Sequence, residues 1–181
     1  MKKSRAGFCW AFHTSAKPSR RRYLTINAVL RIDATLCYND FMQKKILWTD
    51  GSASPNPGPG GFAVIEDDHP VALGREPDTT NIRMEARALI AAIEYADGTP
   101  AEIHTDSEFW VNVATKWAPT WEKNNWRKKS GEIKNLDLVK QLYQLYNEGS
   151  VELVWTRGHV GTPENELADE WANKARKGAT L

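Results

Sequence analysis

Hydrophobic and polar positions follow regular periods from residue 45 onwards, and the first part of this region is typical of β-strands. Asp67-Asp68-His69 separates two apolar runs and predicts a hairpin. Asp50-Gly51-Ser52 is expected to end the first strand in a turn, and the Pro- and Gly-rich residues 54–61 are expected to be irregular. The three predicted strands are residues 46–49, 62–66 and 70–74.

The rest of the chain mixes helical and strand patterns. An apolar face along residues 83–96, stopped by Gly98 and Pro100, is the clearest helical signal. Further helices are predicted at 108–115, 136–146 and 163–177, and strands at 102–105 and 151–155. The order β-β-β-α-β-α-α-β-α predicts an α/β fold, a five-stranded mixed sheet flanked by helices.

Residues 1–41 differ from the rest in pattern and charge. They show no sustained period, and they carry eight Lys and Arg against two Asp, a net charge of +6, whereas residues 42–181 carry 16 against 21, a net charge of −5. We expect a poorly ordered basic extension. This extension resembles an organelle transit segment. Alternatively, translation begins at Met42, which stands directly before the patterned region, and residues 1–41 come from a start assigned too far upstream. The main domain is therefore predicted at 42–181.

Composition narrows the class of protein and the type of metal site. The 181 residues are 41% hydrophobic and 26% charged, and no run approaches the roughly 18 apolar residues of a membrane span. Both cysteines, Cys9 and Cys37, lie in the extension. Any metal in the main domain must therefore be held by oxygen or imidazole ligands.

Four carboxylates stand where strand ends and helix starts could bring them together: Asp50, Glu85, Asp106 and Asp169. Each also has an ordinary structural explanation. Asp50 could serve a turn, Asp106 could cap a helix, and the other two suit the N-terminal halves of helices. Spacing alone leaves both interpretations open.

The sequence around these acids closely resembles type 1 ribonuclease H over about residues 44–177. The matching segments are Thr49-Asp50-Gly51-Ser52, Asn56-Pro57-Gly58-Pro59-Gly60-Gly61, Thr79-Thr80-Asn81, Arg83-Met84-Glu85, Thr105-Asp106-Ser107, Gly158-His159, and Pro163-Glu164-Asn165-Glu166 leading to Asp169. The resemblance implies a ribonuclease H-like fold and an endoribonuclease that hydrolyses the RNA strand of RNA–DNA hybrids. The resemblance further implies that this enzyme leaves 5′-phosphate and 3′-hydroxyl ends on the cut RNA.

The resemblance also implies that Asp50, Glu85, Asp106 and Asp169 are catalytic and hold two Mg²⁺ ions, with Mn²⁺ as an alternative. Four converging acids would repel one another unless hard cations neutralise them, and oxygen ligands suit these ions. His159 matches the position of a mobile catalytic histidine that shuttles protons or aids product release. Its ordinary alternative is an exposed loop histidine.

Substrate contacts are implied at two groups of positions. Asn56 and Asn81 match residues that contact the RNA strand near its 2′-hydroxyls, and Thr80 matches a residue that binds a phosphate of the DNA strand. Asn165 also matches a family position. Capping and loop hydrogen bonds are the alternative for these residues.

A basic, aromatic stretch at residues 110–134 resembles the family's basic protrusion. Residues 116–134 contain six Lys and Arg against two Glu, a local charge of +4. Such a surface suits a nucleic-acid backbone, and the alternative is core tryptophans with a solvated lysine face. We expect Trp110 to be buried. The expected substrate contacts are Trp121, Lys123, Trp126, Arg127, Lys128 and Lys129.

Two positions depart from the family pattern, because Ile82 and Glu108 replace polar amides of many relatives. Minor-groove contacts are therefore expected to differ. Two other functions were weighed, a catalytically inactive hybrid-binding module and the nuclease domain of a retroelement polymerase. The four carboxylates and the basic stretch disfavour them. We expect a cytoplasmic monomer that binds no membrane.

Overall fold

The computed structural model describes residues 44–129, 131–158 and 160–181. The predicted basic extension, residues 1–41, lies outside the described residues, and so does His159. The described residues belong to one compact unit, 41–181.

Five strands form one mixed sheet in the order β3-β2-β1-β4-β5. β1 is antiparallel to β2 and parallel to β4, and β4 is parallel to β5. This arrangement confirms the predicted fold class. The strands are β1 (Lys45–Ala53), β2 (Gly58–Glu66), β3 (His69–Thr79), β4 (Ala101–Thr105) and β5 (Val151–Trp155).

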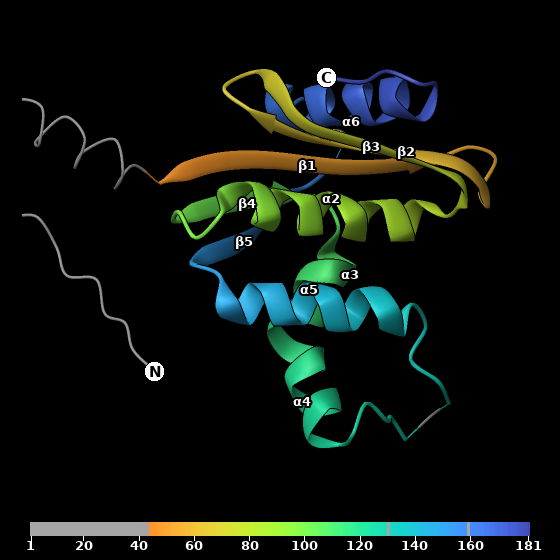
Figure 1. Cartoon of the computed structure of the whole chain (residues 1–181), viewed down its shortest axis with the longest axis vertical. Coiled ribbons are helices and arrows are strands. Elements are labelled where there is room, and N and C mark those ends of the chain that lie inside the picture. The colour runs from red at the N-terminus through yellow and green to blue at the C-terminus, as the bar shows by residue number, and fades with distance from the viewer. Residues whose placement is uncertain (1–43, 130, 159) are drawn as a thin grey trace, which may run out of the picture. The chain divides into compact units, whose positions relative to one another are not determined.

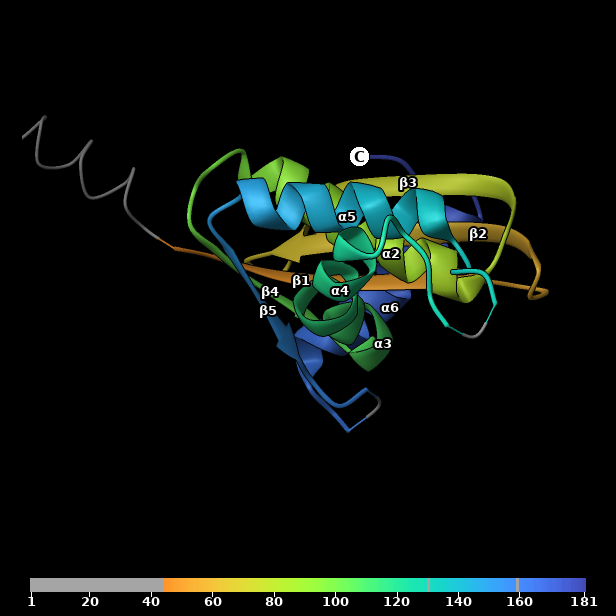
Figure 2. The same cartoon turned by 90° about the horizontal axis from the view of Figure 1, so that it is seen from below.

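Helices cover both faces of the sheet. In Figure 1, α6 lies on one side of the strands, and α2 and α5 lie on the other, while α4 projects from the α5 side; Figure 2 shows the same layers from below. No helix within the described residues is long and apolar enough to cross a membrane. The helices are α2 (Asn81–Ala96), α3 (Glu108–Asn112), the π-helix η1 (Val113–Trp117), α4 (Ala118–Lys123), α5 (Leu136–Glu148) and α6 (Pro163–Arg176).

The predicted ends of the first two strands were wrong. β1 does not turn at Asp50 but continues to Ala53, and β2 already begins at Gly58, inside the segment expected to be irregular. The two extensions pair with each other, with Ser52 opposite Gly61 and Ala53 opposite Gly60. Cross-strand hydrogen bonding therefore overrides the local turn preference of these residues.

Two hydrophobic layers fix the helices on the sheet. Trp110 is fully buried in the larger layer, as predicted, and its indole N–H donates to the Ile82 carbonyl at 2.6 Å. Two glycines allow close contact between layers. A side chain at Gly51 would overlap the backbone of α2 at Glu85, and one at Gly61 would overlap the backbone of α6 at Arg176. Both helices thus lie directly against the strands that carry or flank the candidate site.

Candidate active site

Strand register places Asp50 and Asp106 side by side. Thr49 of β1 pairs with Thr105 of the parallel strand β4, and each aspartate follows its threonine directly. Because parallel strands run in the same direction, the next residues occupy neighbouring positions. The carboxyl end of β4 therefore meets the middle of β1 at two acids.

α2 supplies Glu85 from its second turn. The absence of a side chain at Gly51 lets this turn lie against β1. The hydroxyl of Ser107, the residue after Asp106, donates to Glu85 Oε2 at 2.6 Å. Ser107 is buried, so this hydrogen bond fixes one oxygen of the glutamate.

α6 supplies Asp169 from the other face of the sheet. The Asn173 side chain, one helical turn later, donates through Nδ2 to Asp169 Oδ1 at 3.0 Å. Ser52 of β1 donates to Asn173 Oδ1 at 2.9 Å, which connects α6 to the strand that carries Asp50.

The pKa of the Asp50 carboxyl is raised well above its ordinary value. Burial is the largest cause, and the negative charge of Asp106 is the next. The Gly51 N–H, which donates to Asp50 Oδ1 at 2.7 Å, opposes the shift, while Asp169 and Glu85 add to it. The other three acids thus all act on the Asp50 carboxylate, so the four residues that the sequence singled out lie near one another.

The pKa of Glu85 is also raised. Burial is again the largest cause, the hydrogen bond from Ser107 lowers the pKa, and Asp106 raises it. Two neighbouring carboxylates whose pKa values are raised by burial and by nearby negative charge are typical of functional sites.

The donor set suits hard divalent cations, although the acids are not packed into a closed cage. Within the described residues, no group of three or more His, Cys, Asp or Glu side chains lies close enough to hold one ion. Mg²⁺ commonly takes only one or two carboxylates and completes its octahedron with water and substrate phosphate. Asp50 and the three carboxylates around it therefore fit open ion sites that substrate would complete.

The loop after β5 touches the site through Gly158. A side chain there would place its Cβ 2.5 Å from Asp106 Oδ2, closer than any ordinary contact. The Trp155 indole N–H donates to the Asp106 carbonyl at 3.2 Å. A side chain at position 158 would therefore have to displace the Asp106 carboxylate. The adjacent His159, predicted as catalytic, lies outside the described residues.

The candidate RNA and DNA contacts meet at the start of α2. Asn56 accepts from the Asn81 N–H at 3.3 Å, and Asn81 Oδ1 accepts from the Ala53 N–H. Thr80 is the N-cap residue of α2, but its side chain makes no capping hydrogen bond and its buried hydroxyl has no partner among the described residues. No capping hydrogen bond therefore accounts for the threonine at position 80. The side-chain oxygens of Asn56 and Asn81, in contrast, each already accept a hydrogen bond from a backbone N–H.

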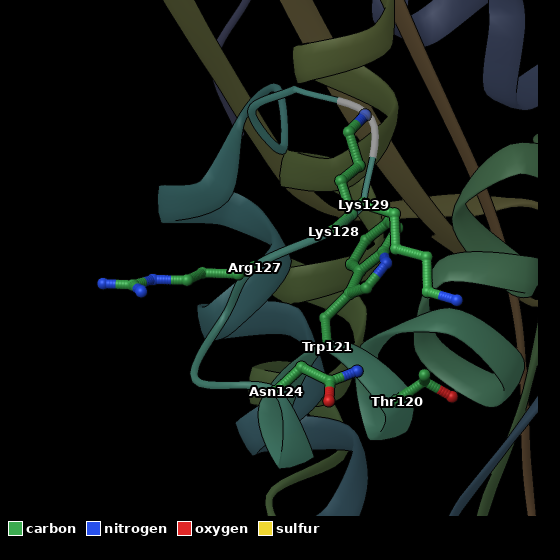
Figure 3. Close-up of a pocket in the computed structure, with 6 residues that line it drawn as sticks. All are labelled: Thr120, Trp121, Asn124, Arg127, Lys128 and Lys129. Carbon is green, nitrogen blue, oxygen red and sulfur yellow. The ribbon is translucent and has the colours of Figure 1, made fainter.

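The basic protrusion consists of α4 and the segment that follows it, residues 118–134. Lys123, Arg127, Lys128 and Lys129 are exposed, and none forms an ion pair within the described part of the chain. A pocket of about 480 Å³ lies among Thr120, Trp121, Asn124, Arg127, Lys128 and Lys129. In Figure 3 the Arg127 side chain points away from the Trp121 ring and from both lysines.

The two tryptophans predicted to contact substrate differ in their surroundings. Trp121 stacks obliquely on exposed Trp117, with ring centroids 6.1 Å apart. Trp126 meets Tyr143 of α5 edge-on at 6.0 Å, and Lys140 lies 5.3 Å from its ring centroid. One face of Trp126 is thus engaged by α5, and both tryptophans are half-buried against the main hydrophobic core.

Sequence reasoning missed the residues that orient the carboxylates. Ser107 holds Glu85, Asn173 holds Asp169, and Gly158 leaves room for Asp106. The spacing of four between Asp169 and Asn173 was a readable signal, because such residues share a helix face. The Ser107–Glu85 contact has no such signal, since it joins distant segments.

Comparisons with known proteins agree with this geometry. A family model described as RNase H matches residues 42–177. Ribonuclease H of Granulibacter bethesdensis is 43% identical over 136 residues, covering 72% of this chain and 90% of that protein. Ribonuclease HI of Pasteurella multocida is 39% identical over 147 residues, covering 77% and 95%. The crystal structure of LC9-RNase H1, titled a type 1 RNase H with the type 2 active-site motif, matches with a TM-score of 0.63 and 29% identity, covering 76% and 75%.

Proposed function

This chain belongs to the ribonuclease H family, and we propose that it cleaves the RNA strand of RNA–DNA hybrids with two Mg²⁺ ions held by Asp50, Glu85, Asp106 and Asp169. The observation that carries the assignment is the placement of the four acids: strand register sets Asp50 beside Asp106, and Glu85 and Asp169 lie close enough for their charges to act on Asp50. Carboxylates that repel one another in this way are stabilised by divalent cations. Mn²⁺ also fits the oxygen ligands.

Asp50, Glu85, Asp106 and Asp169 would hold the two ions, which would supply activation of a water on one side of the phosphodiester and stabilisation of the leaving 3′-oxygen on the other. The chain's own residues fix the carboxylates before substrate arrives. The Gly51 N–H orients Asp50, and Ser107 orients Glu85. Since these donors occupy one oxygen of each carboxylate, the second oxygen is left for a ligand. The products carry 5′-phosphate and 3′-hydroxyl ends.

Substrate recognition is divided between the two strands of the hybrid. Asn56 and Asn81 contact the RNA strand, where the 2′-hydroxyl distinguishes RNA from DNA. We assign Thr80 to a DNA-strand phosphate from the family position that it matches, and its buried hydroxyl would have to turn outward to make this contact. Trp121, Trp126 and the four exposed cations of the protrusion contact the backbone and sugars of the same hybrid.

His159 has an auxiliary role as proton shuttle or in product release, because an imidazole titrates near neutral pH. One chain supplies all four carboxylates, so a monomer suffices for activity. The ribonuclease H domain is residues 42–181, and residues 1–41 are dispensable for it. The expected location is the cytoplasm.

The test is cleavage of labelled RNA–DNA hybrid, duplex RNA and single strands with Mg²⁺, Mn²⁺ or EDTA. We expect Mg²⁺-dependent cleavage of the hybrid alone, and none after Asp50→Asn. Hybrid binding without cleavage in Mg²⁺ or Mn²⁺ would support an inactive binding module instead. Full activity of the Asp50→Asn variant would refute the site assignment.

A further inference from the structure

Asn173 does not belong to the four acids, yet its side chain links two of the elements that carry them. Its Nδ2 donates both to the Asp169 carbonyl and to Asp169 Oδ1, each at 3.0 Å. Its Oδ1 accepts from Ser52 Oγ at 2.9 Å and from Arg176 Nη2 at 3.3 Å. The amide of Asn173 thus makes four hydrogen bonds, which join Asp169, Ser52 and Arg176.

The surroundings determine which way the amide faces. Arg176 has only donors, so the atom of Asn173 that faces it must be the oxygen. The NH₂ group must then face Asp169. Arg176 is itself held at the loop, where its Nη1 donates to the Ser54 carbonyl at 3.4 Å.

We propose that Asn173 is a positioning residue for the Asp169 carboxylate, held in register with β1 by Ser52. This inference rests on the proposed function, in which Asp169 is a metal ligand. Ser52 lies two residues after Asp50, on the same face of β1. The chain of bonds from Ser52 through Asn173 to Asp169 therefore holds the Asp169 carboxylate of α6 in register with the strand that carries Asp50.

The chemistry of an amide suits this task. Asn173 fixes Asp169 Oδ1 with a neutral donor, so the carboxylate keeps its full negative charge for a cation. A lysine four residues along a helix would form an ion pair instead, as Lys174 does with Glu170 at 2.7 Å. Such a pair would compete with a divalent ion for the carboxylate.

The test is divalent-ion binding to the full-length protein without substrate, measured with Mn²⁺ by calorimetry, together with the Mg²⁺ dependence of hybrid cleavage. Asn173→Leu keeps the branched shape and the number of side-chain heavy atoms, adds some volume, and removes the donor. Loss of an orienting partner outside the ligand set costs about 10- to 100-fold in metal affinity. We expect Mn²⁺ affinity to fall about tenfold and the Mg²⁺ midpoint of cleavage to rise by a similar factor. The rate should largely recover at saturating Mg²⁺.

Ser52→Ala breaks the same chain from the other end and should shift both midpoints in the same direction by a smaller factor. Asn147→Leu is the matched control, because Asn147 is an exposed asparagine of another helix, α5. It should change neither midpoint. Denaturant unfolding of each variant in EDTA separates a loss of stability from a positioning effect, because only a variant that is fully folded without metal reports the affinity of the site itself.

A double-mutant cycle separates this inference from the proposed function. In an Asp169→Asn background, Asn173→Leu should have no further effect on Mn²⁺ binding. If Asp169→Asn lowers Mn²⁺ affinity and Asn173→Leu alone leaves it unchanged, the positioning role is wrong while the site stands. If Asp169→Asn itself leaves Mn²⁺ binding and cleavage intact, the proposed site is wrong and the inference falls with it.

Discussion

The four exposed cations of the basic protrusion should make hybrid binding strongly dependent on salt. Replacing Lys123, Arg127, Lys128 and Lys129 with Ala removes up to four phosphate contacts. Each such contact contributes about 0.9 to the slope of log affinity against log salt on a duplex. A fourfold increase from 50 to 200 mM salt therefore weakens binding about 3.5-fold per contact, and about 150-fold for four contacts.

The side chains favour this full effect because the four cations are unpaired within the described residues. No internal ion pair has to break before they meet a phosphate. Arg127 points away from the other groups of its pocket (Figure 3), so it contacts a different phosphate or none. If the salt slope of the variant is smaller than that of the parent by about 2.7 rather than 3.6, three phosphate contacts are lost, and we would assign them to the three lysines.

The measurement is hybrid affinity by fluorescence anisotropy between 50 and 200 mM salt, in Ca²⁺ or EDTA to prevent cleavage. KM should also rise much more than kcat falls, because the lost contacts bind substrate and transition state equally. The control replaces four cations elsewhere, Lys44, Arg75, Lys174 and Lys177, for the same change in net charge. Its slope should stay close to that of the parent, because screening confines exposed charges to about 10 Å. Equal slopes for parent and protrusion variant would show that the protrusion is only a solvated face.

Four further predictions concern the site and the extension. Asp50→Asn should abolish cleavage and raise the melting temperature in EDTA at neutral pH. Because the pKa of Asp50 is raised in the folded protein, the free energy of unfolding of the parent falls as pH rises through that pKa. The variant lacks this carboxyl and should therefore show a flatter pH dependence of unfolding. Gly158→Ala should cost about 1–3 kcal/mol of stability by overpacking and about 100-fold in kcat by displacing Asp106, measured by denaturant unfolding and single-turnover cleavage. His159→Ala should slow turnover about 10- to 100-fold, and complete inactivity with normal metal binding would make the histidine essential. A protein that begins at Met42 should melt and cleave short hybrids like the full chain, and a truncated protein that fails to fold would place the domain boundary elsewhere.

The order of elements could be predicted from the sequence because most segments carry their own period. The helix at 83–96 and the strand at 151–155 depend on local apolar spacing, and both appear close to their predicted limits. The end of β1 could not be predicted in this way. Its last residues are held by pairing with Gly60 and Gly61, a contact between segments that no local pattern records.

For the candidate site, too, the sequence identifies the residues but not the contacts that orient their side chains. Motifs identify Asp50, Glu85, Asp106 and Asp169, since acids in these contexts are distinctive. The ability of a carboxylate to bind an ion depends on which of its oxygens already accepts a hydrogen bond. The donors that decide this are the Gly51 amide, Ser107 and Asn173. A neutral donor orients a carboxylate without cancelling its charge, whereas a cation in the same place would do both. The pKa of Asp50 is raised first by burial and next by the charges of Asp106, Asp169 and Glu85. The three orienting donors around this site are all neutral, so these negative charges remain available to the divalent ions that we propose.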